Sequence, residues 1–208
     1  MPMRVAGVVI AGGQSTRMGG GDKCLKLLDD RPLLAHVAER LRGQSEALVL
    51  NANGDPARFS PWMTQIVPDE MPDLGPLGGI HAGLKWAAAH PSGFTHIVTA
   101  AADTPFFPLD LTNRLTETAA GMDRVALAAS AGRVHPVFGL WPVTMLEALG
   151  AFLARAGAAS VRRFAEGEGR AAIAEFPLED GFDPFFNVNT PGDLTLARKI
   201  AARRNTKL

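Results

Sequence analysis

Residues 5–23 read VAGVVIAGGQSTRMGGGDK, and this stretch restricts the fold class more than any other. Its first part, residues 5–11, is dense in β-branched side chains and runs into glycine, which is typical of a parallel strand that is buried on both faces. Its second part has glycine at positions 12, 13, 19, 20 and 21. Such a backbone can adopt positive φ angles and approach a ligand closely. The stretch therefore predicts a buried first strand followed by a ligand-facing loop.

Strands and helices alternate beyond this stretch. We expect further strands at residues 47–51, 66–67 and 96–101, and helices at residues 32–41 and 76–89. Alternation of this kind implies right-handed crossovers and an α/β fold with a doubly wound, mostly parallel sheet, similar to a Rossmann fold. Ligands of such sheets gather beyond the carboxyl ends of the strands.

The second half is less regular. Residues 125–130 and 134–140 flank the turn sequence Ala131-Gly132-Arg133, so we expect a hairpin and a small antiparallel excursion there. A short helix capped by Ser160, an edge strand at 171–176 and a final helix at 190–203 complete the chain. No internal repeat or linker is evident, so we expect a single domain over residues 1–208.

Composition narrows the class of protein. The 21 basic and 21 acidic side chains cancel, so no long-range field draws the chain to nucleic acid or to a membrane surface. Cys24 is the one cysteine, which excludes an internal disulfide and a zinc site built from several cysteines. The apolar run after Arg4 is too short to cross a bilayer. We expect a cytoplasmic protein.

The chemistry of the glycine-rich loop favours phosphate. Successive backbone N–H groups can converge on oxygen anions, and Arg17 and Lys23 add cationic donors. The loop lacks the Gly-x-Gly-x-x-Gly pattern of dinucleotide-binding folds. It also has Asp22 directly before Lys23, whereas a Walker A loop has glycine before its lysine. The sequence therefore does not favour assignment to the nicotinamide-dependent dehydrogenases or to the P-loop proteins. The plainer alternative is a surface loop in which Asp22 pairs with Lys23 in water.

Residues 10–23 together with five later segments resemble the molybdenum cofactor guanylyltransferase family, within the nucleotidyltransferase superfamily. The segments are VLNAN (49–53), PDEMPDLGPLGGI (68–80), AADTPF (101–106), RVHPV (133–137) and FFNVNTPGDL (185–194). The resemblance spans nearly the whole chain as one nucleotidyltransferase domain. It implies an enzyme that transfers GMP from GTP to the terminal phosphate of molybdopterin or molybdenum cofactor and releases pyrophosphate. The alternatives are a CTP-dependent or sugar-phosphate nucleotidyltransferase, or a non-catalytic nucleotide-binding regulator.

The resemblance also implies a nucleotide site. Asp103, just past a predicted strand, would bind Mg²⁺, for which carboxylate oxygen is a suitable ligand; its plainer role is to cap the following helix. Lys23, assisted by Arg17, would neutralise the phosphates of GTP. The main chain of the first loop would read the guanine base at Ile10, Ala11, Gly12 and Gly13. Two further residues would hold the nucleoside, or else serve as turn residues: Asn51 and Asp69.

The pterin acceptor would bind nearby. The turn into the helix at residue 76 offers unpaired N–H groups to an anion, or simply reverses the chain. The positions that the resemblance assigns to the pterin side are Gly75, Leu77, Gly78, Gly79, His135, Asn187 and Asn189. Partners among other cofactor-biosynthesis proteins or target-enzyme chaperones are also expected.

Overall fold

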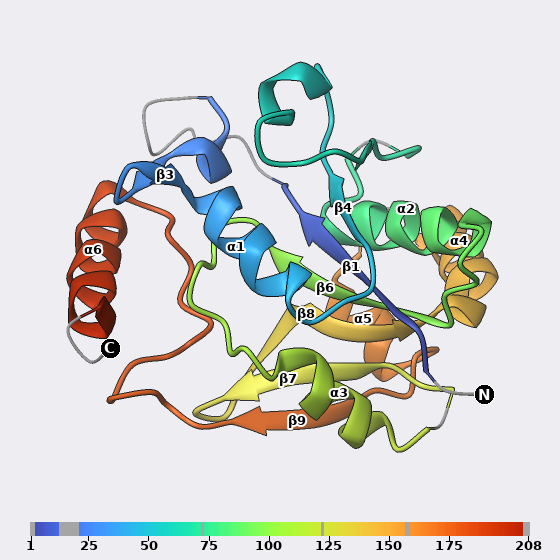
Figure 1. The fold of residues 1–208 in the computed structure, drawn as a ribbon. Coiled ribbons are helices and arrows are strands. Elements are labelled where there is room, and N and C mark those ends of the chain that lie inside the picture. The colour runs from blue at the N-terminus through green and yellow to red at the C-terminus, as the bar shows by residue number, and fades with distance from the viewer. Residues whose placement is uncertain (1–2, 13–20, 72, 122, 157–158, 206–208) are drawn as a thin grey trace.

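The computed structural model describes residues 3–12, 21–71, 73–121, 123–156 and 159–205 (Figure 1). Its centre is a seven-stranded sheet in the order β5-β4-β1-β6-β8-β7-β9. The strands are β1 Val5–Ile10, β4 Leu48–Asn51, β5 Ile66–Val67, β6 His96–Ala101, β7 Ala126–Ser130, β8 Arg133–Pro142 and β9 Ala172–Phe176. The strands β5, β4, β1 and β6 run parallel, as the alternation of strands and helices predicted.

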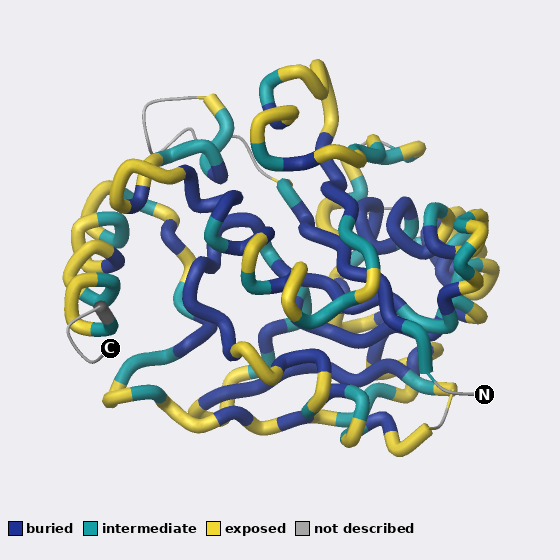
Figure 2. Tube along the Cα trace, in the orientation of Figure 1, coloured by how far each residue is buried: buried dark blue, intermediate teal, exposed yellow. Residues whose placement is uncertain are grey.

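Helices cover both faces of this sheet. They are α1 Leu33–Arg42, α2 Pro76–Ala89, α3 Leu111–Ala119, α4 Leu146–Ala156, α5 Val161–Glu166 and α6 Pro191–Asn205. Val9 of β1 packs on the side of α1 and α3, whereas its neighbour Val8 packs on the side of α2, α4 and α5. Every residue of β1 is consequently buried, and Figure 2 shows the sheet as the dark interior of the molecule. The doubly wound α/β prediction is confirmed.

The topology creates a crevice at one edge of the sheet. Chain order proceeds outward from β1 to β4 and β5, and the next strand, β6, lies on the other side of β1. The carboxyl ends of β1, β4 and β6 therefore meet where the strand order reverses, which is the usual ligand position in open α/β sheets.

The second half contains the predicted hairpin and edge strand. Ala131 and Gly132 connect β7 to β8 with φ angles of 48° and 74°, the two positive values that a tight hairpin turn requires. The strand β8 is antiparallel to both β6 and β7, and β9 forms the outer edge beside β7. Ser160 caps α5 as expected, because its hydroxyl accepts a hydrogen bond from Arg163 N at 3.1 Å.

Some local structure differs from the prediction. Helix α1 begins at Leu33, because Pro32 is extended (ψ 150°) and pairs with Leu27 in a small hairpin of β2 (Leu27–Leu28) and β3 (Arg31–Pro32). That hairpin, α3, α4 and three short 3₁₀ turns are additions to the predicted elements. The turns are η2 Lys23–Leu25, η3 Pro56–Phe59 and η4 Val143–Met145. Across the described residues, no helix combines the length and apolarity that a membrane span needs.

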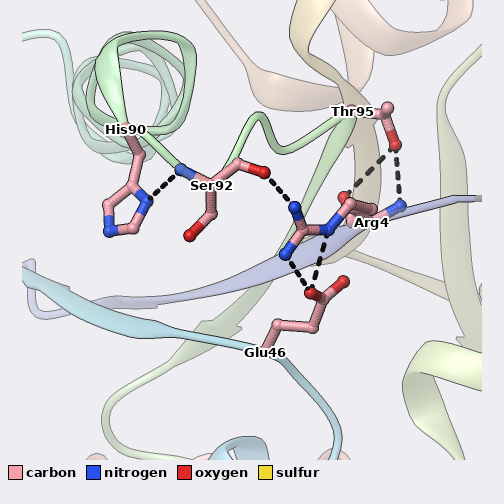
Figure 3. A network of polar contacts seen from close by, with 5 residues as sticks. All are labelled: Arg4, Glu46, His90, Ser92 and Thr95. Atoms are coloured by element: carbon pink, nitrogen blue, oxygen red, sulfur yellow. Dashed lines mark hydrogen bonds and ion pairs between the residues drawn. The ribbon is translucent and has the colours of Figure 1, made fainter.

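A polar network ties the sheet together at the end opposite the crevice (Figure 3). Arg4, just before β1, donates from Nε to Glu46 Oε2 at 3.0 Å and from Nη1 to the carbonyl of Ser92. Its backbone N–H donates to Thr95 Oγ1 at 2.9 Å. Because Glu46 precedes β4 and Thr95 precedes β6, the side chain and backbone of this one residue link the starts of three neighbouring parallel strands.

Candidate functional site

A pocket of about 390 Å³ opens at the carboxyl ends of β1 and β6. Residues from the first loop, the start of α2, the end of β6 and two later segments surround it. They are Ile10, Ala11, Gly12, Asp22, Lys23, Cys24, Gly75, Pro76, Ala101, Ala102, Asp103, Val137 and Asn187. The pocket lies at the reversal of strand order, where open α/β sheets usually bind their ligands.

Lys23 and Asp103 form an ion pair in this pocket, between Lys23 Nζ and Asp103 Oδ2. Lys23 begins the turn η2 and Asp103 follows β6, so the two residues are 80 positions apart in the sequence. Their side chains are only 17% and 12% exposed. Asp103 is far from the cap of α3, which begins at Leu111, and therefore does not serve as its cap.

Asp22 pairs with Arg58, and not with Lys23 as one interpretation of the sequence suggested. Its carboxylate accepts from Arg58 Nε at 2.5 Å and from Arg58 Nη2 at 3.3 Å, while Lys23 turns to Asp103. Arg58 also donates to the carbonyl of Asn53 at 2.6 Å. The Asp22 side chain thus fastens η3 to the start of η2 and leaves the ammonium of Lys23 to the pocket.

The carboxylate of Asp103 has the chemistry of a cation ligand. Its Oδ2 already holds the Lys23 ammonium, and its Oδ1 accepts from Thr104 Oγ1 at 3.2 Å. Within the described residues no cluster of three His, Cys, Asp or Glu side chains exists that could enclose a metal. Mg²⁺ commonly takes one or two carboxylates and completes its shell with water and substrate phosphates, so a single aspartate at a pocket rim fits it.

Asn51 and Asp69 meet beside the pocket, at the ends of β4 and β5. Asn51 Nδ2 donates to Asp69 Oδ1 at 2.8 Å. Asn53 completes the cluster: its Nδ2 donates to Asp69 Oδ2 at 2.9 Å and its Oδ1 accepts from Asp69 N at 2.8 Å. The two predicted residues are thus brought together, although neither lines the pocket itself.

Gly79 of α2 makes room for this cluster. A Cβ at Gly79 would lie 2.2 Å from Asn51 Oδ1 and 3.1 Å from Ile10 Cδ1, so a side chain there must displace the amide. Gly78, Gly79 and Leu77 are all buried in the packing of α2, outside the lining of the pocket.

Gly79→Ala therefore tests the Asn51–Asp69 pair. We expect the methyl group to break this pair and to reduce the free energy of unfolding by about 1–3 kcal/mol, the usual cost of overpacking. Denaturant unfolding measures this cost. The matched control is Gly43→Ala, because Gly43 has an ordinary φ of −69° and a Cβ there would come no nearer than 3.7 Å to another residue. Equal stabilities of the two variants would contradict the prediction.

Gly75 gives the pocket its second backbone wall. It is the N-cap of α2 with φ 60° and ψ −149°, a conformation essentially restricted to glycine. The first turn of α2 consequently begins at the pocket, with Gly75 and Pro76 in its lining. Helix N-termini favour anions through their unpaired N–H groups, so this wall suits a phosphate or carboxylate.

His135 lies in a buried polar cluster instead of in the pocket lining. Its Nε2 is 2.7 Å from Ser130 Oγ, which in turn donates to Asp183 Oδ1 at 2.8 Å, and its ring stacks on Phe185 with centroids 4.6 Å apart. Burial lowers the pKa of His135, which favours the neutral ring. Two residues farther along β8, Val137 does line the pocket.

Val137 owes its position to an irregularity in β8. The pairing of β7 with β8 shifts between Leu127 and Ala128, which leaves Val137 outside the ladder. The buried Thr99 of β6 compensates: its Oγ1 donates to Val137 O at 2.6 Å and accepts from Trp141 Nε1 at 3.0 Å. A bulge of this kind often redirects a side chain next to a functional site.

Asn189 contacts Lys23, and Asn187 contacts Thr104, the residue that follows Asp103. Asn187 lines the pocket and accepts from Thr104 Oγ1 at 2.9 Å. Asn189 accepts from Lys23 Nζ at 2.6 Å. Of the residues singled out in the sequence, Gly13 and Arg17 lie outside the described part of the chain.

Sequence reasoning missed several lining residues. Asp22 stands inside the glycine-rich motif and could have been found there, whereas no local signal marks Val137. Nor does any local signal mark Arg58, which lies outside the lining and bonds Asp22. Cys24 also lines the pocket, but burial, followed by the charge of Asp22, raises the pKa of its thiol to about 12. The thiol is therefore neutral near pH 7 and is a poor nucleophile.

The chain is similar to known proteins over almost its whole length. Residues 7–171 match the model of the MobA-like NTP transferase domain. A protein named molybdenum cofactor guanylyltransferase from Bradyrhizobium sp. (strain ORS 278) is 48% identical over 200 residues, covering 95% of this chain and 93% of that one. A protein of the same name from Cereibacter sphaeroides is 50% identical over 198 residues, covering 95% and 97%.

A solved structure shows the same fold. Molybdopterin-guanine dinucleotide biosynthesis protein A from Archaeoglobus fulgidus superposes with a TM-score of 0.72. The alignment covers 95% of this chain and 99% of that one at 23% sequence identity.

Proposed function

We propose that this chain, which belongs to the MobA-like NTP transferase family, transfers GMP from GTP to the terminal phosphate of molybdopterin or molybdenum cofactor and releases pyrophosphate. The product is the guanine dinucleotide form of the cofactor. Relatives with the name molybdenum cofactor guanylyltransferase, 48% and 50% identical over nearly the full length, support this reaction.

One observation carries the proposal. An ammonium and a carboxylate 80 positions apart in the sequence meet in a pocket that the glycine-containing backbone of residues 10–12 also lines. Phosphoryl and nucleotidyl transfer depend chiefly on positioning and on charge stabilisation. Lys23 supplies positive charge for a triphosphate, and the pocket walls at Gly12 and Gly75 supply backbone groups.

The residues of the chain then have the following roles. Lys23 donates to the phosphates of GTP and offsets the charge that grows on pyrophosphate as it leaves. The main chain of residues 10–13 offers N–H and C=O groups to the guanine edge, and Asn51 with Asp69 holds the nucleoside. The terminal phosphate of the acceptor attacks the α-phosphorus in line. No protein nucleophile takes part, in agreement with the neutral thiol of Cys24.

Asp103 is the proposed ligand of a divalent cation, Mg²⁺ in our proposal. When bound, the cation supplies positive charge to the triphosphate beyond what Lys23 provides. Asp103 lines the pocket, and its Oδ1 shares the single hydroxyl proton of Thr104 with Asn187 Oδ1. Arg17, in the same loop as Lys23, is proposed as a second cationic donor to the phosphates.

The pterin side is proposed to involve the start of α2 at Gly75 together with Asn187, which also lines the pocket. We place the reaction in the cytoplasm, since a free buried cysteine suits a reducing compartment. Proteins that deliver the acceptor or receive the product are further proposed partners.

A nucleotide panel tests the function. The purified chain is incubated with Mg²⁺, pterin acceptor and each of the four NTPs, and pyrophosphate is measured. We expect release with GTP that depends on the acceptor. Faster pyrophosphate release with CTP than with GTP would show that the enzyme prefers cytosine to guanine. Absence of pyrophosphate release with all four nucleotides would refute the proposed function. A covalent nucleotidyl-enzyme, detectable by mass spectrometry, would refute direct transfer.

A further inference from the structure

Three consecutive residues, Asn187–Asn189, reach both members of the Lys23–Asp103 pair. Asn189 Oδ1 accepts from Lys23 Nζ at 2.6 Å across 166 positions of sequence. The next residue back, Val188, donates from its backbone N–H to the carbonyl of Asp103 at 3.0 Å. Asn187 Oδ1 accepts from the hydroxyl of Thr104 at 2.9 Å. The C-terminal segment thus contacts each member of the pair once, and it also bonds Thr104, the residue after Asp103.

The backbone on either side of Asn189 is fixed. The Val188 side chain is fully buried in a cluster that contains Leu28, Leu33, Phe106 and Ala197. On the other side, Asp193 Oδ2 accepts from Asn189 N at 2.9 Å and from Thr190 N at 2.8 Å. Thr190 Oγ1 accepts from Asp193 N at 3.1 Å, which completes a reciprocal cap at the start of α6. The amide of Asn189 therefore projects from a rigid support.

Lys23 needs such a support. A lysine ammonium is a point charge on a flexible four-carbon stem, so its location depends on the acceptors around it. Asp103 and Asn189 are the two acceptors found for Lys23 Nζ among the described residues. Because Asp103 is also the proposed cation ligand, its carboxylate cannot serve Lys23 alone once a cation binds. Asn189 can continue to hold the ammonium, and its neutral amide adds no negative charge that would repel a triphosphate.

We infer that Asn189 is a positioning residue for Lys23: its amide oxygen holds the ammonium at the place where the phosphates of the nucleotide bind. The inference rests on the proposed function, because it takes a nucleoside triphosphate to be the ligand of Lys23. It gives Asn189 a role in binding the nucleotide, distinct from contact with the pterin.

A double-mutant cycle tests this role. GTP affinity is measured by calorimetry with Mg²⁺ and without acceptor, for the wild-type chain, Asn189→Ala, Lys23→Ala and the double variant. Loss of a hydrogen bond to a charged group leads us to expect about tenfold weaker binding in Asn189→Ala. In the Lys23→Ala background the same change should cost less than about twofold, because its partner is already gone. The acceptor KM of Asn189→Ala should remain that of the wild type.

Two controls separate positioning from a loss of folding. Asn113→Ala removes an exposed amide from α3 and should leave GTP affinity unchanged. Asn189→Ser keeps the backbone N–H that bonds Asp193 while shortening the side chain, and it should weaken GTP binding as Asn189→Ala does. Thermal melting of both Asn189 variants within a few degrees of the wild type shows that the fold is retained.

The contrary outcomes are distinct. Wild-type GTP affinity in Asn189→Ala with a raised acceptor KM would overturn the inference and assign Asn189 to the pterin side. Losses that multiply in the double variant would also overturn it, since they would show that Asn189 acts independently of Lys23. If the wild-type chain turns over GTP, either of these results in the variants refutes the inference and leaves the proposed function intact. A wild-type chain that neither binds nor turns over GTP refutes the proposed function together with the inference.

Discussion

Asp103→Asn should lower metal-dependent turnover by about 10³-fold, the upper end of what loss of one charge-stabilising group costs. The substitution keeps the size of the side chain and an oxygen for the Thr104 hydroxyl, which donates to Asp103 Oδ1 at 3.2 Å. It removes the negative charge that holds Lys23 and that is proposed to bind the cation. Initial rates of pyrophosphate release at saturating GTP, measured over a range of Mg²⁺ concentrations, give the effect.

The matched control for this change is Asp110→Asn. Asp110 is an exposed aspartate at the N-cap of α3 whose side chain makes no capping hydrogen bond. We expect wild-type turnover from it. If Asp103→Asn retained turnover within tenfold of the wild type while Mg²⁺ dependence persisted, the cation would have another ligand and Asp103 would leave the mechanism.

Lys23→Met should lower kcat/KM for GTP by about 10²- to 10³-fold, because it removes the cationic donor proposed for the departing pyrophosphate. Methionine retains most of the apolar stem, so the comparison isolates the ammonium. A second effect follows from burial, because the Asp103 side chain is only 12% exposed and loses its ion-pair partner. We therefore expect a lower melting temperature than that of the wild type, partly restored by Mg²⁺.

Steady-state kinetics and thermal melting, each with and without Mg²⁺, measure the two effects of Lys23→Met. Lys199→Met, at an exposed position on α6, is the control and should change neither. An unchanged kcat/KM in Lys23→Met would contradict the role of the ammonium in transfer. Melting that does not respond to Mg²⁺ would contradict cation binding at Asp103.

The sequence predicted those elements that local signals define. The apolar run at 5–11 predicted β1, with an error of one residue at its end, and the Gly75-Pro76 pair predicted the start of α2. The Ala131-Gly132 turn gave the hairpin, because a two-residue turn needs positive φ angles that few sequences favour. Helix α4 was missed although Leu149, Phe152 and Leu153 repeat at helical spacing and are buried.

Pro32 illustrates a competing local preference. Proline is favoured in the first turn of a helix, but it is equally suited to extended backbone. Here the pairing of Pro32 with Leu27 in the β2–β3 hairpin keeps it extended, and α1 starts one residue later. Tertiary contact decided between two conformations that the residue itself allows.

The site followed from the sequence in part. The glycine-rich loop, Lys23 and Asp103 were predicted at the carboxyl ends of parallel strands, and the structure brings Lys23, Asp103, Ile10, Ala11, Gly12, Gly75 and Asn187 into one pocket. Asn51 and Asp69 form a separate pair beside it. The roles of all these residues in nucleotide and pterin binding remain predictions that the variants above address.

The sequence alone determined that this chain has a buried first strand, a glycine-rich stretch after it and an acidic residue at the end of a later strand, since each depends on residues that are adjacent in the chain. Tertiary structure decided which side chains meet: Asp22 with Arg58, Lys23 with Asp103, and Lys23 with Asn189. These partners lie 36 to 166 positions apart. No local backbone preference reaches so far, so their pairing depends on how the sheet, α6 and the loops pack together.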